Sequence, residues 1–265
     1  MHRIGTSMQA FLTEARKKTK SIVALLLTFT AGMVDIVGYI TLYHFFVAHM
    51  TGTTVHLGNK LAASQWAEAA KSGSILISFV GGSVLGRSII ELGARARRRT
   101  IATVTLLAEA VLVLSFVWLR DWAVGPAPAH ELRLSTTCVL LALLAAAMGL
   151  QTATLTRVGP LTIHTTFVTG MLNKFAQAVS QWMFWLHDHW RERFSGTRPT
   201  RHVAFRNALF MAAIWTSYLV GSIAGTVMNS RWSVAALYLP VFILIVSAGI
   251  DQMQPLSLEE ESEQA

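Results

Sequence analysis

Six long apolar stretches constrain the fold of this chain more than any other feature. They lie at about residues 21–43, 73–92, 101–119, 134–155, 207–228 and 233–250. Each is about as long as the roughly 20-residue helix that crosses a hydrocarbon core of about 30 Å. Because backbone polar groups in lipid must be satisfied within the segment itself, these stretches are expected to be helices. The sequence therefore predicts an all-α, polytopic membrane bundle with six spans.

The charge of the chain favours the lipid bilayer as its surroundings and argues against nucleic acid as a partner. Only 14% of the residues are charged, against about a quarter in soluble domains. The net charge of +8 comes from basic residues that flank the apolar stretches, and the sequence contains no nucleic-acid-binding motif. The single cysteine, Cys138, lies inside an apolar stretch, which excludes an intramolecular disulfide and a thiolate metal cluster.

The basic residues also predict an orientation, because the cytoplasmic loops of membrane proteins collect Lys and Arg. If the N-terminus is inside and each apolar stretch crosses once, two arginine clusters fall on the cytoplasmic side: Arg95, Arg97, Arg98 and Arg99, and Arg191, Arg193, Arg198, Arg201 and Arg206. Both termini are then cytoplasmic. The expected organisation is a basic N-terminus at 1–20, a first membrane repeat at 21–119, an external loop at 120–133, a second repeat at 134–250 with a cytoplasmic loop at about 186–206, and an acidic tail at 251–265.

Three landmarks occur in the same order in both halves of the chain, which predicts an internal repeat. Gly32-x-x-Asp35 matches Gly149-x-x-Thr152, Thr51-Gly52 matches Thr169-Gly170, and Gly82-Ser-Val-Leu-Gly86 matches Gly221-Ser-Ile-Ala-Gly225. Because each half contains three spans, the halves lie in opposite orientations. The prediction is an inverted 3+3 repeat, an arrangement common among secondary transporters.

The Thr-Gly pairs open two segments, at about 50–66 and 165–185, that are more polar than the spans and more helix-like than loops. Two interpretations compete. Each segment is either a re-entrant half-helix that enters the protein from its own side, or a full span that would give eight helices and parallel halves. The re-entrant interpretation is favoured, because the second would place the cluster at Arg95–Arg99 outside.

Two acids fall near the middle of apolar stretches, Asp35 in the first and Glu109 in the third. An ionisable group at bilayer depth costs at least about 2.5 kcal/mol, and such groups usually belong to substrate, ion or proton pathways. A protonated or hydrogen-bonded structural acid is the alternative for each.

Small and polar residues complete the predicted substrate or ion pathway: Thr51, Gly52, Thr53, Asn59, Gln151, Thr152, Thr169, Gly170 and Asn173. A broken helix that starts at membrane depth presents free N–H groups and the positive end of its dipole, which suits an anion. Two such segments entering from opposite faces are expected to meet near the midplane; simple helix capping is the alternative. Gly82, Gly86, Gly221 and Gly225 form small-x-x-x-small pairs, which predict close helix packing or a dimer face.

The run from Phe46 to Asn59, preceded by Gly32-x-x-Asp35, resembles the bacterial YoaK family, also called DUF1275. In that family a phrase like F-V-A-N-M-T-G-N follows a first helix with G-x-x-D. His49 and Thr53 depart from it, because Asn is usual at the first of these positions and favoured at the second. The resemblance implies a six-span protein of the bacterial inner membrane and leaves the chemistry open.

These features favour a transporter or channel for a small polar solute; an anionic solute and proton coupling both fit. An intramembrane enzyme that acts on a lipid-soluble substrate and a non-catalytic scaffold are the alternatives. No metal-ligand spacing, nucleotide-binding loop or nucleophile motif occurs, so neither a metal nor a cofactor is predicted. The expected partners are the bilayer and the solute, and a homo-oligomer fits the glycine motifs.

Overall fold

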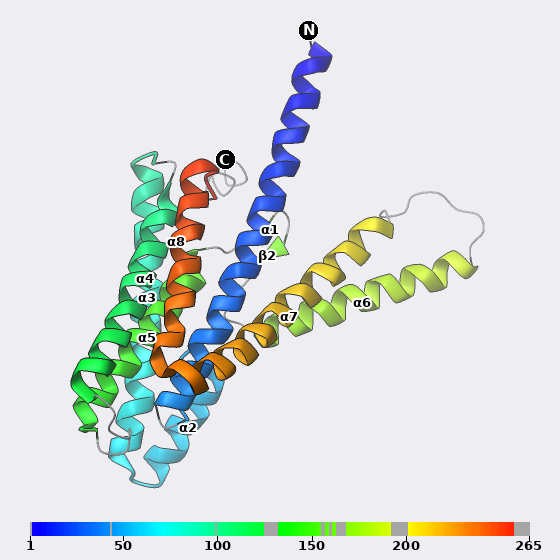
Figure 1. Ribbon diagram of the computed structural model, residues 1–265. Coiled ribbons are helices and arrows are strands. Elements are labelled where there is room, and N and C mark those ends of the chain that lie inside the picture. Colours follow the sequence, from blue (N-terminus) through cyan, green and yellow to red (C-terminus); the bar gives the residue numbers. More distant parts are fainter. Residues whose placement is uncertain are drawn as a thin grey trace.

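The computed structural model describes residues 2–42, 44–98, 100–124, 132–154, 157–158, 161–162, 168–191 and 201–256. The chain is helical apart from one short hairpin (Figure 1). The helices are α1 (His2–Thr41), α2 (Met50–Ala62), α3 (Trp66–Arg95), α4 (Ile101–Val124), α5 (Leu134–Thr154), α6 (Val168–Arg191), α7 (Arg201–Trp232), the 3-10 helix η2 (Ser233–Leu237) and α8 (Tyr238–Met253). Strands β1 (Arg157–Val158) and β2 (Leu161–Thr162) pair antiparallel, with Arg157 opposite Thr162.

Five segments are long and apolar enough to cross a membrane, so the chain is a multi-pass helical membrane protein. They are Arg16–Thr41, Trp66–Arg95, Ile101–Trp122, Leu134–Thr154 and Phe205–Met253. The last has 49 residues and contains two helices, because the chain reverses direction at η2 between α7 and α8 (Figure 1). The six apolar stretches of the sequence correspond to α1, α3, α4, α5, α7 and η2–α8.

Several helices extend beyond the apolar stretches that predicted them. Helix α1 begins at His2, so the basic N-terminus continues the first span as one helix. The predicted cytoplasmic loop at about 186–206 is helical at both ends, because α6 continues to Arg191 and α7 begins at Arg201. Polar residues extend a helix when one of its faces packs on a neighbour, and α6 lies along α7 (Figure 1). The middle of that predicted loop, 192–200, and most of the predicted acidic tail lie outside the described residues.

Helices α1 and α7 touch through their backbones. A Cβ atom placed on Gly32 would overlap the carbonyl oxygen of Tyr218, and one on Gly221 would overlap that of Phe29. The Ser222 hydroxyl donates to the Gly32 carbonyl at 3.3 Å. Small residues are what allow two helices in a membrane to approach this closely.

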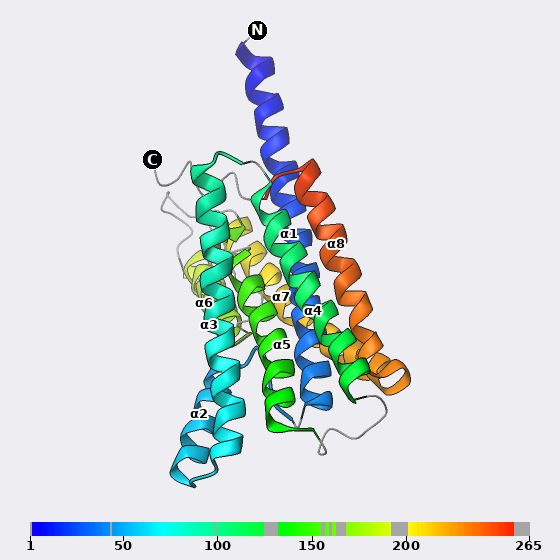
Figure 2. The same cartoon turned by 90° about the vertical axis from the view of Figure 1, so that its left-hand side faces the viewer.

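Helices α3 and α5 make a contact of the same kind. A Cβ on Gly149 would overlap the carbonyl oxygen of Phe79, one on Gly82 would overlap that of Ala146, and the Ser83 hydroxyl donates to the Gly149 carbonyl at 3.2 Å. Gly82 of α3 therefore packs against α5, and Gly221 of α7 packs against α1. In both pairs the two helices come from opposite halves of the chain. Figure 2 shows α3 and α5 side by side in front of α1.

Helix α8 is joined to the start of α4 by a buried carboxylate. Asp251 Oδ2 accepts hydrogen bonds from the Thr103 backbone N–H at 2.8 Å and from the Thr103 hydroxyl at 2.7 Å, while Oδ1 accepts the N–H of Leu256 at 2.8 Å. The first N–H groups of a helix have no partner within it, and Asp251 supplies one from another helix. This contact fixes the register between α4 and α8.

Candidate functional site

Asp35 holds the segment that leads from α1 into α2. Its side chain is 3% exposed. Oδ1 accepts the backbone N–H groups of Val47 and Ala48 at 2.8 and 2.9 Å, and Oδ2 accepts the hydroxyl of Tyr218, on α7, at 2.7 Å. Because Asp35 lies more than one turn before the end of α1, the chain must turn back along α1 to make these bonds. Helix α2 therefore starts beside the interior of α1.

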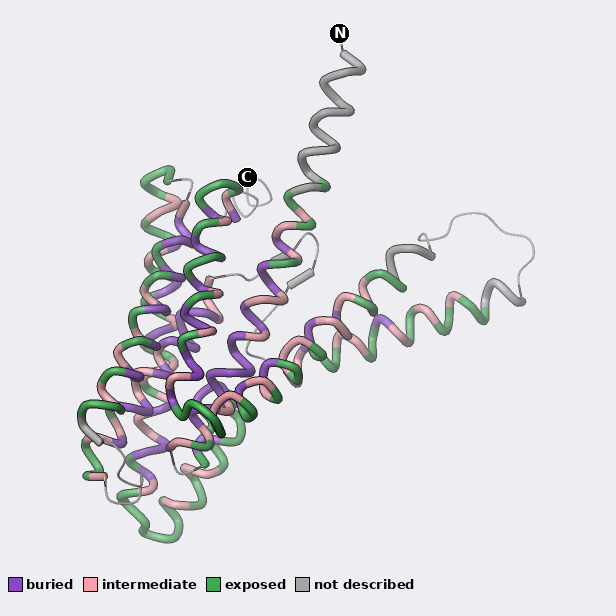
Figure 3. Tube along the Cα trace, viewed as in Figure 1, coloured by how far each residue is buried: buried purple, intermediate pink, exposed green. Residues whose placement is uncertain are grey.

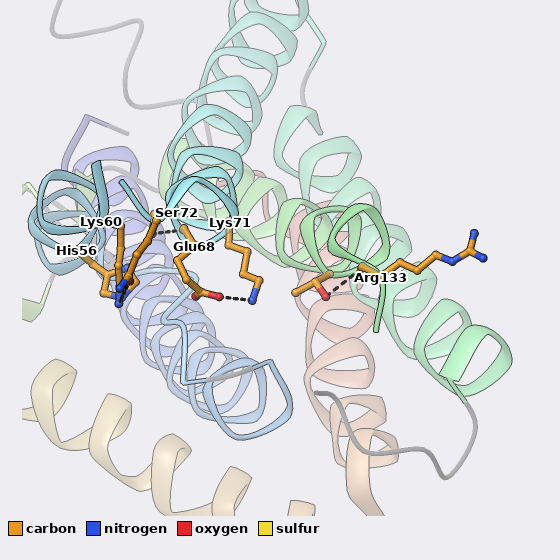
Figure 4. Close-up of polar contacts among 8 residues, drawn as sticks. His56, Lys60, Glu68, Lys71, Ser72 and Arg133 are labelled. Carbon is orange, nitrogen blue, oxygen red and sulfur yellow. Dashed lines mark hydrogen bonds and ion pairs between the residues drawn. The ribbon is translucent and has the colours of Figure 1, made fainter. Parts of the chain in front are cut away.

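Helix α2 is short and remains attached to α3. Its 13 residues span about 20 Å, less than the hydrocarbon core of about 30 Å. His56 Nδ1 lies 2.9 Å from the Ser72 hydroxyl of α3, and Lys60 donates to Gln65 at 2.8 Å at the turn between the helices. Lys71 pairs with Glu68 at 2.7 Å on the same end of α3 (Figure 4). This end of the molecule is thus polar and ordered.

The Thr-Gly pairs do not line an enclosed cavity. Thr51, Gly52, Asn59, Thr169 and Asn173 are exposed and Gly170 is half-buried. Thr53 is the buried member of the set, and its hydroxyl donates to the His49 carbonyl at 3.1 Å. Helix α2 packs on α3 and α6 packs on α7. The expected meeting of the two segments at the midplane is therefore not a packed contact among the described residues.

Helix α6, which begins at the second Thr-Gly pair, is longer than α2 and packs on α7 instead of α3. It has 24 residues, and within the described part of the chain it is not one of the segments apolar enough to span. With α7 it points away from the other helices (Figure 1), and its surface is largely exposed or half-buried (Figure 3). A mostly apolar groove of about 590 Å³ runs along it, between Phe175 and His187.

Glu109 of α4 is fully enclosed and has no hydrogen-bond partner among the described residues. The side chain is 0% exposed, and neither carboxyl oxygen has a hydrogen-bond partner among the described residues. Burying a charge without compensation costs several kcal/mol at least, so the carboxyl group is neutral in this conformation. Gln151 is also fully buried and donates its Nε2 to the Leu27 carbonyl, which joins α5 to α1. Thr152 is half-buried and donates to the Met148 carbonyl at 2.8 Å.

Four further polar residues contribute to this interior that sequence reasoning missed. Tyr218 and Asp251 anchor Asp35 and α4, and the hydroxyl oxygens of Thr30 and Ser247 are fully buried without a partner in the described structure. Tyr218 precedes the second glycine motif by three residues, a spacing that puts both on one helix face, and this could have indicated it. Nothing in the sequence distinguishes Thr30 or Ser247 from other hydroxyls in apolar helices.

The described residues include no group of three or more His, Cys, Asp or Glu side chains that could hold a metal ion. The titratable side chains in the span helices are dispersed, with Asp35 bound to backbone and Tyr218, and Glu109 isolated. The described interior thus contains single acids and hydroxyls and no cluster of them.

The fold defines a multi-pass helical membrane protein in whose apolar interior single acids and hydroxyls are buried. The chain belongs to the family described as protein of unknown function (DUF1275), whose model matches residues 23–250. It is similar to the UPF0700 transmembrane protein YoaK of Bacillus subtilis (strain 168), with 25% identity over 236 residues that cover 89% of this chain and 94% of the relative. No solved structure matches the chain.

Proposed function

We propose that the protein is a transporter or channel for a small polar solute, built from two inverted halves of three spans each. The observation that carries this proposal is the duplicated backbone contact. Every glycine contact between α1 and α7 has a counterpart between α5 and α3, made by the residues that the sequence repeat pairs. Inverted repeats that enclose polar residues near the midplane are a common plan of secondary transporters.

The directions of the helices support the inversion. In Figures 1 and 2, α1 and α4 run from the end that carries the N-terminus to the opposite end and α3 runs back, whereas α5 and α8 run back and α7 runs forward. With six crossings, both termini and the turn after Arg95 lie on one side. The positive-inside rule makes that side cytoplasmic, in the inner membrane of a bacterium. Helix α2 is then a re-entrant half-helix on the external side.

This topology predicts which turns react with a membrane-impermeant thiol reagent. Cys138 is the single cysteine, so a Cys138→Ala background allows one cysteine to be placed at a time. In intact spheroplasts, Gln65→Cys in the turn between α2 and α3 should react, and Arg97→Cys between α3 and α4 should react only after permeabilisation. The same variants in inverted vesicles are the control, with the pattern reversed. Labelling of both positions from one side would overturn the six-span proposal.

The solute proposal predicts a ligand that stabilises the purified protein. A compound at about 100 times its dissociation constant adds about 2.7 kcal/mol to the free energy of unfolding, which a thermal unfolding assay resolves. The panel consists of small anions and polar metabolites at two pH values. Compounds that stabilise the protein are then tested for uptake into vesicles that contain it.

Matched variants locate the solute. Thr51 is exposed at the start of α2, where the N-cap residue His49 makes no side-chain hydrogen bond to the first N–H groups. Thr51→Val should lower the apparent affinity for the ligand, measured from the ligand-dependent shift in thermal stability, at least tenfold. Thr226→Val, an exposed threonine on α7, should leave it unchanged. A folded protein that no compound stabilises and that supports no uptake contradicts the transporter proposal and favours the scaffold.

A further inference from the structure

Two of the acids buried in the span helices, Asp35 and Glu109, are held in opposite ways. Asp35 accepts three hydrogen bonds, from Val47, Ala48 and Tyr218. These donors favour an ionised carboxylate, and they make Asp35 a fixed connection between α1, α7 and the start of α2. Glu109 accepts none from the described residues, although it is equally enclosed. An acid without donors is stable there only when it carries its own proton.

Two buried hydroxyls lie at nearly the depth of Glu109. From the contact between Thr103 and Asp251, Glu109 is six residues along α4 and Ser247 is four residues back along α8, which places them about 9 and 6 Å from that contact in the same direction. The Thr19 hydroxyl of α1 bonds to Gln254, just after α8. Counted along α1 from this bond, Thr30 lies about one helical turn deeper than Ser247. All three side chains are 0% exposed.

No charged side chain described on the neighbouring helices is bonded to Glu109. The charged or titratable side chains described on the helices packed against α4 are Cys138 on α5, Tyr238 and Asp251 on α8, and Glu68, Lys71, Arg87, Glu91 and Arg95 on α3. None of them forms an ion pair or a hydrogen bond with Glu109. Asp251 is bound to Thr103 and Leu256, and Arg87 is exposed on the outer surface of α3. No counter-ion therefore compensates a charge on Glu109 in this conformation.

We propose that Glu109 is the proton-binding group of the translocation pathway. The Ser247 and Thr30 hydroxyls are the groups that hydrogen-bond its carboxyl group when the helices move. This inference rests on the proposed transport function. A carboxyl oxygen of Glu109 forms an O–H bond with a proton taken from water, and release returns that proton to water without any redox change. Asp35 positions α2 throughout.

The test is infrared spectroscopy of the purified protein in lipid, in H2O and in D2O, across mildly acidic to alkaline pH. A protonated carboxyl gives a C=O band separate from carboxylate bands. At neutral pH the band is expected in the wild type and in Asp35→Asn and Glu91→Gln, and it is expected to disappear in Glu109→Gln. Glu91, which pairs with Arg95 on the surface of α3, provides the matched control.

Exchange into D2O separates a proton site from a sealed structural acid. The Glu109 band should move to lower frequency within minutes of exchange, because the bound proton is replaced by deuterium. A band that persists in Glu109→Gln, that is absent from the wild type, or that never shifts in D2O overturns the inference. If Glu109→Gln does not fold, Glu109→Asp serves instead, since a carboxyl retained in a new position shifts the band. No solute enters this experiment, so its result is independent of the uptake assay.

Discussion

Gly82→Ala is expected to destabilise the protein by about 2–3 kcal/mol, although alanine is the better helix former. The new Cβ would overlap the carbonyl oxygen of Ala146, so α3 and α5 must separate along their tightest contact. Overpacking of this kind costs about 1–3 kcal/mol or more, and it exceeds the gain of up to about 1 kcal/mol in helix propensity. Thermal or denaturant unfolding of the purified protein measures the difference.

The neighbouring glycine gives the matched control. A Cβ on Gly81 meets nothing within 4 Å, so Gly81→Ala should be neutral or slightly stabilising. Gly221→Ala should reproduce the loss seen for Gly82→Ala, because its Cβ would overlap the Phe29 carbonyl between α1 and α7. Equal stability of Gly81→Ala and Gly82→Ala would contradict the backbone contact, and a loss confined to Gly82 would contradict the equivalence of the two helix pairs.

Asp35→Ala is expected to cost at least about 3 kcal/mol, the second large effect. It removes the acceptor for three buried donors, and hydrogen bonds to a charged group are worth about 1.5–3 kcal/mol each. Asp35→Asn should lose less, because the amide oxygen still accepts the N–H groups of Val47 and Ala48. Tyr218→Phe should lose about 1–2 kcal/mol, since one donor of the three is removed. The free energy of unfolding of the three variants gives this order directly.

A labelling experiment distinguishes local from global loss. Phe46→Cys, in the Cys138→Ala background, lies in the segment that Asp35 holds; Phe46 itself is 41% exposed. Adding Asp35→Ala should raise the rate of thiol labelling at this position before the helices unfold. An unchanged labelling rate, or wild-type stability of Asp35→Ala, would show that the bonds to Val47 and Ala48 do not fasten α2.

The span helices were predictable because apolar length is a local property, and all six apolar stretches correspond to described helices. The spacing of Gly82 and Gly86, and of Gly221 and Gly225, indicated close helix contacts, because such contacts need small residues at fixed spacing. The partners of these glycines were not predictable. Periodicity indicates which face of a helix is buried, whereas the neighbour that buries it depends on tertiary arrangement.

The interior acids illustrate the same limit. Asp35 and Glu109 could be singled out from the sequence because each lies in an apolar stretch, where a charge in lipid is costly. The difference between them depends on donors that lie elsewhere: Val47 and Ala48 reach Asp35 through a turn after α1, and Tyr218 reaches it from α7. Such long-range bonds leave no mark in the local pattern.

The exchanged pairing of helices also sets an order for assembly in the cell. The bond between Ser222 and Gly32 joins residues 190 positions apart, whereas the matching bond between Ser83 and Gly149 joins residues 66 apart. As the chain leaves the ribosome, α3 meets its tight partner α5 early, while α1 stays in the bilayer without α7 until most of the protein has been made. A chain that stops after α4 contains α1 and α3 but lacks their partners α7 and α5. The first half of the chain therefore cannot complete its packing alone.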